Sequence, residues 1–254
     1  MSIGSSKPEF MPGRAEKGDL YWAVIEHVRT WRRDDQEYRT IIDANAGKLD
    51  GKILKGIAIK YGVNRGICAK IEGVSVPADE YAKLLNERLE KWPAGLVARA
   101  KWCADVAVEA KRRGFTHGFQ ASGVTKLAWF ARPRQWTPYD NYAQRAMRLA
   151  ATDTLARMTQ FYRELDRRGF LDIADQVQRV LDSRPEMKLH GTRVIDKFMM
   201  LQGAEYGKGK LWADRLRSEC DQFLGLQSPD RRRAIVDLAE IIARNVDLSD
   251  FVNG

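Results

Sequence analysis

Apolar residues recur at intervals of three and four positions along most of this chain, which is the spacing of one face of an α-helix. The segment over residues 19–34 shows the pattern clearly, with Leu20, Val24 and Val28 one turn apart and Asp19 in an N-cap position. No segment keeps the two-residue alternation of a half-buried strand. The pattern therefore predicts an all-α fold.

Prolines, glycines and capping residues divide the rest of the pattern into separate helices. Pro77 opens one helix with acidic residues in its first turn and Pro93 stops it, while Gly114 and Gly169 follow the last turns of two others. We expect helices over residues 36–43, 77–92, 96–113, 152–168, 172–181, 191–201, 210–223 and 231–244.

The region from Leu54 to Cys68 leaves two interpretations open. It loosely fits a helix-turn-helix, with Gly62 in the turn and basic residues around Arg65 on a helix that would enter DNA. Its repeated glycines weaken both helices, since each costs about 1 kcal/mol relative to alanine in a helix interior. The alternative, which we prefer, is a pair of short helices that pack in the N-terminal part of the protein.

Length and charge bound the organisation and the partners. The 254 residues suffice for one large domain or two lobes. We expect a flexible arm over residues 1–17 and one helical domain over 18–254, with lobes of about 18–95 and 96–254. The net charge of +9 suits a polyanion, because each neutralised phosphate releases counterions. Double-stranded DNA is therefore an expected partner, although many basic proteins bind no nucleic acid.

The remaining composition argues against several classes of protein. Cys68, Cys103 and Cys220 are widely spaced, so disulfide, zinc and iron–sulfur scaffolds lack support, and the three histidines are too scattered for a metal site. We expect no metal and no cofactor. The chain has no long apolar run and no secretory pattern, so we expect no membrane partner and a cytoplasmic location.

One stretch, residues 121–147, combines several features that bear on chemistry. It predicts an opening turn, a short apolar helix with Lys126 in its first turn, a loop bracketed by Pro133 and Pro138, and a second helix that begins at Asp140. Each proline pushes the preceding residue out of the α region, so the first helix cannot simply continue. A carboxylate at a helix start is a strong N-cap, and that role alone accounts for Asp140.

The order of these features resembles the catalytic segment of the helix-hairpin-helix DNA glycosylase superfamily, in particular bacterial proteins with an 8-oxoguanine-glycosylase fold. The resemblance is carried by Gly123, Thr125-Lys126, Arg132-Pro133 and Pro138-Tyr139-Asp140. It covers residues 114–150, and more weakly 190–203, where 192–198 resemble a downstream helix of the same group. Two departures are visible: the usual glycine-rich hairpin is reduced to residues 122–124, and the interval from lysine to aspartate is shorter.

The resemblance implies a two-lobed helical fold and a catalytic pair. Lys126 would be the amine nucleophile that attacks C1′ of the sugar, and Asp140 the carboxylate that stabilises positive charge developing there. Trp136, Tyr139 and Tyr142 would line the pocket of a flipped base or fill the gap that it leaves. Core packing is the alternative for these aromatic residues.

The same interpretation predicts contacts to the DNA backbone from small and basic residues around the motif. These are Gly123, Thr125, Arg132, Arg134, Arg145, Lys111, Arg112 and Arg113. The last three also suit the C-terminal end of a helix without any ligand, because cations there complement the helix dipole.

The sequence therefore favours a glycosylase-type enzyme that removes a modified or damaged base from duplex DNA, with lyase activity through Lys126 as a further possibility. The alternative is a protein that keeps the helical fold without catalysis, either as a DNA-binding protein or, through the resemblance alone, in phage defence. Which base is recognised does not follow from the residues.

Overall fold

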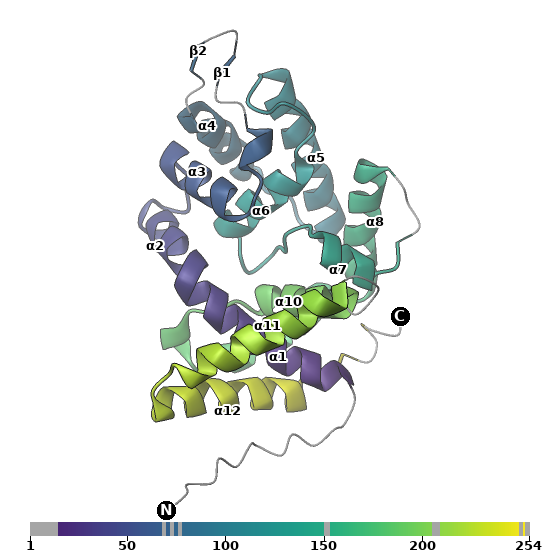
Figure 1. Ribbon diagram of the computed structural model, residues 1–254. Coiled ribbons are helices and arrows are strands. Elements are labelled where there is room, and N and C mark those ends of the chain that lie inside the picture. Colours follow the sequence, from purple (N-terminus) through teal and green to yellow (C-terminus); the bar gives the residue numbers. More distant parts are fainter. Residues whose placement is uncertain are drawn as a thin grey trace, which may run out of the picture.

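The structure of the chain is a computed structural model, which describes residues 15–67, 70–71, 74–75, 78–149, 153–204, 209–248 and 251. Helices make up most of this part of the chain, and the prediction of an all-α fold is confirmed. In Figure 1, α3 to α6 form one group of helices, and α1, α10, α11 and α12 form another, with α7 between them.

Most helix positions match those expected from the apolar pattern. The helices are α1 (Ala15–Thr30), α2 (Gln36–Ala44), α3 (Gly51–Lys60), α4 (Ala78–Leu89), α5 (Leu96–Arg112), α6 (Ala121–Ala131), α7 (Asn141–Ala146), α8 (Thr154–Arg167), α9 (Phe170–Leu181), α10 (Gly191–Ala204), α11 (Lys210–Gly225) and α12 (Pro229–Asn245). Short 3₁₀ turns cover Asn64–Gly66 and Pro185–Met187, and β1 (Lys70–Ile71) pairs antiparallel with β2 (Val74–Ser75).

A π-helical turn over Trp31–Asp35 joins α1 to α2 without a break. Such turns are uncommon and occur frequently at functional sites, because the extra residue changes which side chains face inward. Here both Trp31 and Asp35 are buried, while the residues between them include exposed arginines. The turn therefore places the indole of Trp31 and the carboxylate of Asp35, four positions apart, on the buried side of one continuous helix.

Helix α10 lies at the centre of the packing, and nearly all of its residues are buried. It packs against α1, α7 and α9. Two glycines allow close approach of its neighbours: a Cβ at Gly203 would lie 1.8 Å from the carbonyl oxygen of Tyr142, and one at Gly191 would lie 2.1 Å from that of Ala174. Larger residues at these positions would force α10 away from α7 and α9.

Helices from the two ends of the chain share one core. The first helix, α1, packs against α10, α11 and α12, whereas α3 packs against α4 and α6. Buried apolar residues from both groups belong to a single cluster. A shared core does not mark where one lobe would end and the next begin, so the expected lobe boundary near residue 95 stays a prediction.

The region around residues 54–68 differs from both interpretations of the sequence. It holds one helix, α3, which ends before Gly62 at a left-handed φ of +65°. A 3₁₀ turn follows, and Ile67 then forms an isolated bridge with Thr116. Among the described residues up to Ile67 there is no second α-helix, so a helix-turn-helix does not form there. The preferred pair of short helices is present only as α3 and the 3₁₀ turn over Asn64–Gly66, and Cys68 lies outside the described residues.

One other expectation falls largely outside the described residues. Of the predicted arm over residues 1–17, only Ala15 onward is described, and it already belongs to α1. Among the helices of the described ranges, none combines the length and apolar content that crossing a bilayer requires.

Candidate functional site

Lys126 projects from the second turn of α6, because the helix begins at Ala121, earlier than the sequence indicated. Ser122 and Gly123, expected in an opening turn, form part of the first helical turn instead. Lys126 Nζ lies 3.4 Å from Ser122 Oγ, and that hydroxyl donates a hydrogen bond of 3.1 Å to the carbonyl oxygen of Tyr139. Ser122 therefore links the lysine to the residue that precedes Asp140.

Asp140 caps α7, as its position after Pro138 predicted. Its backbone is extended, with φ −127° and ψ 148°, and Oδ1 accepts a 2.8 Å hydrogen bond from the amide of Tyr142. Its second oxygen makes no hydrogen bond to any residue that the structure describes. The side chain is only partly buried, so one carboxylate oxygen remains for a further role.

The charge of Asp140 affects the ionisation of Lys126 across the connection between α6 and α7. Burial lowers the pKa of Lys126, since the ammonium is separated from water, and the positive charge of Arg193 lowers it further. The carboxylates of Asp140 and Asp196 oppose this shift. A lysine with a lowered pKa has a larger fraction of free amine near neutral pH, which is the reactive form.

Arg193 and Asp196 of α10 form a buried ion pair next to Lys126 and Asp140. Arg193 is 5% exposed and Asp196 0%, and Nη1 of the arginine donates to Oδ2 of the aspartate. The guanidinium also lies 5.3 Å from the ring centre of Trp129 and 5.7 Å from that of Tyr61. Burial raises the pKa of Asp196, and Arg193 opposes that rise by favouring the carboxylate form.

The ion pair continues through Tyr61 to the π-helical turn. Arg193 Nη2 lies 3.3 Å from the hydroxyl oxygen of Tyr61, and that hydroxyl donates a 2.9 Å hydrogen bond to Oδ1 of Asp35. Burial raises the pKa of Asp35, whereas the charge of Arg193 lowers it. Tyr61 thus connects the ion pair of α10 to the carboxylate of the π-helical turn.

Three polar atoms of this network are buried without a hydrogen-bond partner among the described residues: Asp35 Oδ2, Arg193 Nε and Asp196 Oδ1. Unpaired buried polar atoms are rare, because each costs about 1–3 kcal/mol of lost hydration. Their concentration around one arginine indicates a polar interior that favours function or specificity over stability.

The aromatic residues proposed for base recognition have separate environments. Trp136 is 0% exposed; it stacks on Tyr162 with ring centres 4.2 Å apart and donates a 2.9 Å hydrogen bond to the carbonyl of Thr125. Tyr139 is 6% exposed, and its hydroxyl donates to the amide oxygen of Gln144. Both residues therefore have the core-packing positions that the sequence left as the alternative, and Trp136 does not present a ring at the surface.

Tyr142 has a different position, at the start of α7 beside Asp140. Its ring stacks on Trp212 of α11, with centres 4.7 Å apart, and the guanidinium of Arg145 lies 5.3 Å from its centre. Tyr142 and Trp212 are both partly exposed. Of the three predicted aromatic residues, Tyr142 is the one with a partly open environment, and Trp212 is a neighbour that sequence reasoning did not identify.

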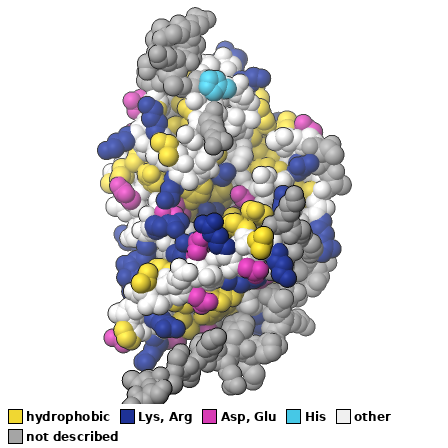
Figure 2. All heavy atoms as spheres, viewed as in Figure 1, with side chains coloured by type: hydrophobic (Ala, Val, Ile, Leu, Met, Phe, Trp, Pro, Cys, Tyr) yellow, Lys and Arg dark blue, Asp and Glu magenta, His cyan; other side chains and the backbone are white. Residues whose placement is uncertain are grey.

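The residues predicted to contact a DNA backbone divide by exposure. Gly123 is buried and Thr125 is 0% exposed, with its hydroxyl bonded inside the protein, so neither residue is available to a phosphate. Arg134 and Arg145 are exposed, whereas Arg132 donates to the carbonyls of Ala131 and Leu89. Basic side chains gather over the left and middle of the face in Figure 2, interspersed with acidic ones.

The basic cluster at the end of α5 is partly neutralised. Lys111, Arg112 and Arg113 are exposed, but Glu109 accepts hydrogen bonds from both arginines at 2.7 Å. These bonds lower the pKa of Glu109 to about 2. The cluster therefore offers a phosphate less charge than its sequence suggests.

Sequence reasoning missed Asp35 and Tyr61, for which no local pattern signals a role. It singled out residues 192–198 through the resemblance but gave no task to Arg193 or Asp196. Their spacing of three positions is that of an ordinary exposed helical ion pair, and only tertiary packing shows that the pair is buried. Within the described ranges, no group of three side chains suited to a metal ion occurs.

The arrangement around Lys126 offers an amine nucleophile with a lowered pKa and a carboxylate with one uncommitted oxygen. A substrate that develops positive charge at an electrophilic carbon would find both groups useful. Comparisons with protein-family models, with curated proteins and with solved structures find no match to this chain.

Proposed function

We propose that this protein is a DNA glycosylase-type enzyme that excises a modified or damaged base from duplex DNA and forms a covalent intermediate through Lys126. The observation that carries the proposal is the electrostatic interaction between Lys126 of α6 and Asp140 at the start of α7. Two side chains fourteen positions apart, each with a standard role in this chemistry, act in one environment.

Each residue has a defined task in the proposed reaction. The free amine of Lys126 attacks C1′ while the bond from C1′ to the base breaks, and the base leaves with the bonding electrons and takes up a proton. Asp140 stays ionised and stabilises the positive charge on the sugar during this step. The amine then loses a proton and the sugar ring opens, which gives a Schiff base between Lys126 and C1′.

The net charge of +9 supports a polyanionic substrate. Tyr142 follows Asp140 by two residues, and its ring forms a partly exposed stack with Trp212. This stack is a candidate contact for an unstacked base. Arg145, which covers Tyr142, is positioned to meet a neighbouring phosphate.

The test is covalent trapping with borohydride on a panel of duplexes that each carry one modified base. Reduction of the Schiff base should link protein and DNA irreversibly. Lys126→Met should abolish the linked product and Asp140→Asn should reduce it strongly. Lys83→Met is the matched control, because it removes an exposed lysine of α4 that lies outside the site. Base release without trapping would discard the lyase step, and no release from any duplex would discard the enzyme.

A second candidate is a DNA-binding protein without catalysis, which the burial of Trp136 and Tyr139 favours. Base flipping usually needs an aromatic or apolar side chain that fills the vacated space, and these two residues are engaged in the core. This candidate predicts DNA affinity that falls steeply with salt and that Lys126→Met and Asp140→Asn leave unchanged. Loss of base release in the same two variants, with affinity intact, would contradict it.

A further inference from the structure

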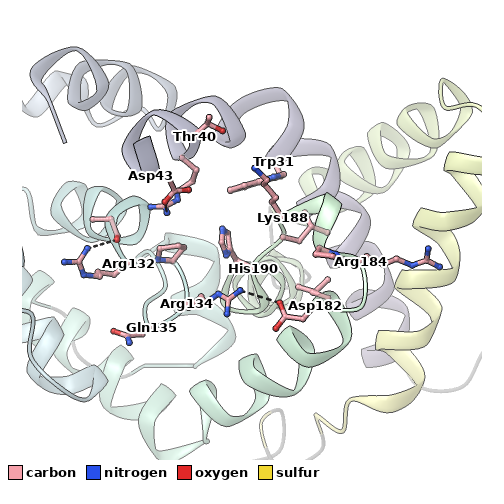
Figure 3. A pocket seen from close by; sticks show the side chains of 16 residues that line it. Trp31, Thr40, Asp43, Arg132, Arg134, Gln135, Asp182, Arg184, Lys188 and His190 are labelled. Atoms are coloured by element: carbon pink, nitrogen blue, oxygen red, sulfur yellow. Dashed lines mark hydrogen bonds and ion pairs between the residues drawn. The ribbon is translucent and has the colours of Figure 1, made fainter. Parts of the chain in front are cut away.

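A cavity of about 600 Å³ lies apart from Lys126 and Asp140, at the other end of α6. Its walls come from three distant segments: the π-helical turn with α2, the loop that follows α6, and the connection between α9 and α10. Figure 3 shows these segments around one space, with His190 near the centre and Arg134 directed toward it. Neither member of the proposed catalytic pair lines this cavity.

The lining carries more positive than negative charge. Five cationic side chains surround the space, namely Arg39, Arg132, Arg134, Arg184 and Lys188, against the two carboxylates of Asp43 and Asp182. Both carboxylates are already engaged, Asp43 by Arg39 and Asp182 by Arg134 at 3.5 Å. Within the described part of the chain, Lys188 forms no ion pair.

His190 adds no negative or positive charge to the cavity at neutral pH. Burial, together with the charges of Arg39 and Arg134, lowers its pKa to about 3. The histidine is therefore neutral, and it leaves the excess positive charge of the arginines and Lys188 unbalanced. Such a lining attracts an anion, and guanidinium groups in particular suit the oxygens of a phosphate.

The remaining lining indicates a ligand larger than a phosphate ion. Trp31, Leu181 and Leu189 supply an apolar wall, and Pro133 and Pro185 add further nonpolar surface. The volume falls within the range of about 300–1,000 Å³ that is typical of small-molecule sites. An anion with an attached ring would use both the charged side and the apolar side of the space.

We propose that this cavity binds a phosphorylated ligand that carries a ring system, of the chemical class of a nucleoside monophosphate. Arg134 and Lys188 contact the phosphate, and the surface around Trp31 receives the ring. The ligand is either a free nucleotide or a nucleotide unit of a DNA strand, since both present the same group. The proposal does not depend on catalysis at Lys126.

The test measures binding of adenosine monophosphate and of adenosine to the whole protein by calorimetric titration at low salt. We expect saturable binding of the monophosphate and an affinity for adenosine that is about tenfold or more weaker, because adenosine lacks the phosphate that would accept charge-assisted hydrogen bonds. The double substitution Arg134→Gln with Lys188→Gln should lower the affinity for the monophosphate by a similar factor. Both side chains are exposed, so the fold should persist.

A matched control removes the same charge elsewhere, through Lys52→Gln with Lys83→Gln on α3 and α4, which are exposed and outside the cavity. Equal affinity for adenosine and its monophosphate, equal loss in the two double variants, or no saturable binding would overturn the proposal. A short duplex that competes with the monophosphate would identify DNA as the source, and simultaneous binding would identify a free nucleotide. Lys126→Met should leave the affinities for adenosine monophosphate and adenosine unchanged, because Lys126 does not line the cavity, and this separates the cavity from the proposed enzyme site.

Discussion

Lys126 Nζ lies 3.4 Å from Oγ of Ser122, one helical turn earlier in α6. The serine hydroxyl already donates its proton to the carbonyl of Tyr139, so its oxygen can only accept from the lysine. An acceptor favours the ammonium form, whereas burial favours the free amine. The ionisation of Lys126 therefore reflects a balance among burial, Ser122, Asp140 and Arg193.

The first prediction concerns this balance and needs no substrate. Asp140→Asn should lower the pKa of Lys126 further, because it removes a negative charge that stabilises the ammonium. Asparagine caps a helix about as well as aspartate, so α7 should remain intact. NMR titration of carbon-13-labelled lysine, with Lys126→Met to assign the signal, measures the shift. The wild-type signal should titrate below lysine in the urea-unfolded chain, and an unchanged value in Asp140→Asn would show that the two charges do not interact.

The second prediction extends the same balance to reactivity. Because the free amine is the attacking group, the rate of borohydride trapping should rise with pH through the lowered pKa of Lys126 and then level off. In Asp140→Asn the midpoint should move to lower pH, while the plateau should fall about 100-fold or more through loss of charge stabilisation. Single-turnover rates across a pH series measure both quantities. A midpoint that stays fixed while the plateau falls would assign the titration to another group.

The third prediction tests the buried ion pair. Arg193→Met should lower the free energy of unfolding by about 3–5 kcal/mol, because Asp196 and Asp35 lose their shared cation in a buried setting. Arg193→Met with Asp196→Asn should lose less than the sum of the two single changes. Arg233→Met, an exposed substitution on α12, should change stability by about 0.5 kcal/mol or less. Denaturant unfolding measures the free energy of unfolding of the two single variants, the double variant and the Arg233→Met control.

The pH dependence of Arg193→Met gives an independent check on its cause. Without the arginine, burial and the charge of Asp140 raise the pKa of Asp196 in the folded state, and the main opposing charge that remains is Lys197. A raised carboxyl pKa means that the folded protein binds the proton more tightly, so the defect should shrink as the pH falls toward 5. A defect of equal size at pH 8 and pH 5 would assign the loss to packing around Trp129 and Tyr61 instead.

Helix positions followed from the sequence because their signals are local. Asp140 caps α7 through an amide two residues away, Pro93 ends the helix before it, and Gly169 takes a left-handed φ of +65° between α8 and α9. The π-helical turn has no comparable signal. The extra residue changes the spacing of the inward-facing side chains within a single turn only, and the pattern over residues 19–34 does not reveal so local a change.

The candidate site was predictable only in part, since burial is a tertiary property. Trp136 follows a proline in a loop, yet its indole reaches the carbonyl of Thr125 and its ring lies against Tyr162. Arg193 and Asp196 have the spacing of a surface ion pair, but α10 is covered by α1, α7 and α9. No periodicity within one helix encodes what covers it.

The fourth prediction concerns the contact between α10 and α7, which holds Tyr142 next to Asp140. Gly203→Ala would place a methyl group 1.8 Å from the carbonyl oxygen of Tyr142, so the helices must separate. We expect a loss of about 1–3 kcal/mol in the free energy of unfolding. Gly225→Ala is the control, because nothing lies within 4 Å of the added group at the end of α11. That change should be neutral or stabilising by up to about 1 kcal/mol, and a similar loss in both variants would contradict the close contact.

The fifth prediction is that acid destabilises the protein through a buried pair of histidines. The amide of His190 donates a 3.0 Å hydrogen bond to Nε2 of His27, so that nitrogen is unprotonated. Burial lowers the pKa of His27, and electrostatic interactions with His190, Arg193 and Lys197 lower it further. Burial with Arg39 and Arg134 lowers the pKa of His190 to about 3.

Because the folded pKa values lie below those of the unfolded chain, the unfolded state binds more protons as the pH falls through about 6.5. Each histidine should therefore remove up to about 1.4 kcal/mol of stability per pH unit between that point and its folded pKa. His190→Phe keeps a ring in contact with Trp31, whose centre lies 4.9 Å from that of His190. The substitution should reduce the slope of the unfolding free energy against pH by the contribution of one histidine. Urea unfolding at pH 7, 6 and 5 measures this, with Gly225→Ala as the control that leaves every histidine in place and should keep the wild-type slope. Equal slopes in wild type and His190→Phe would mean that His190 does not control the acid response.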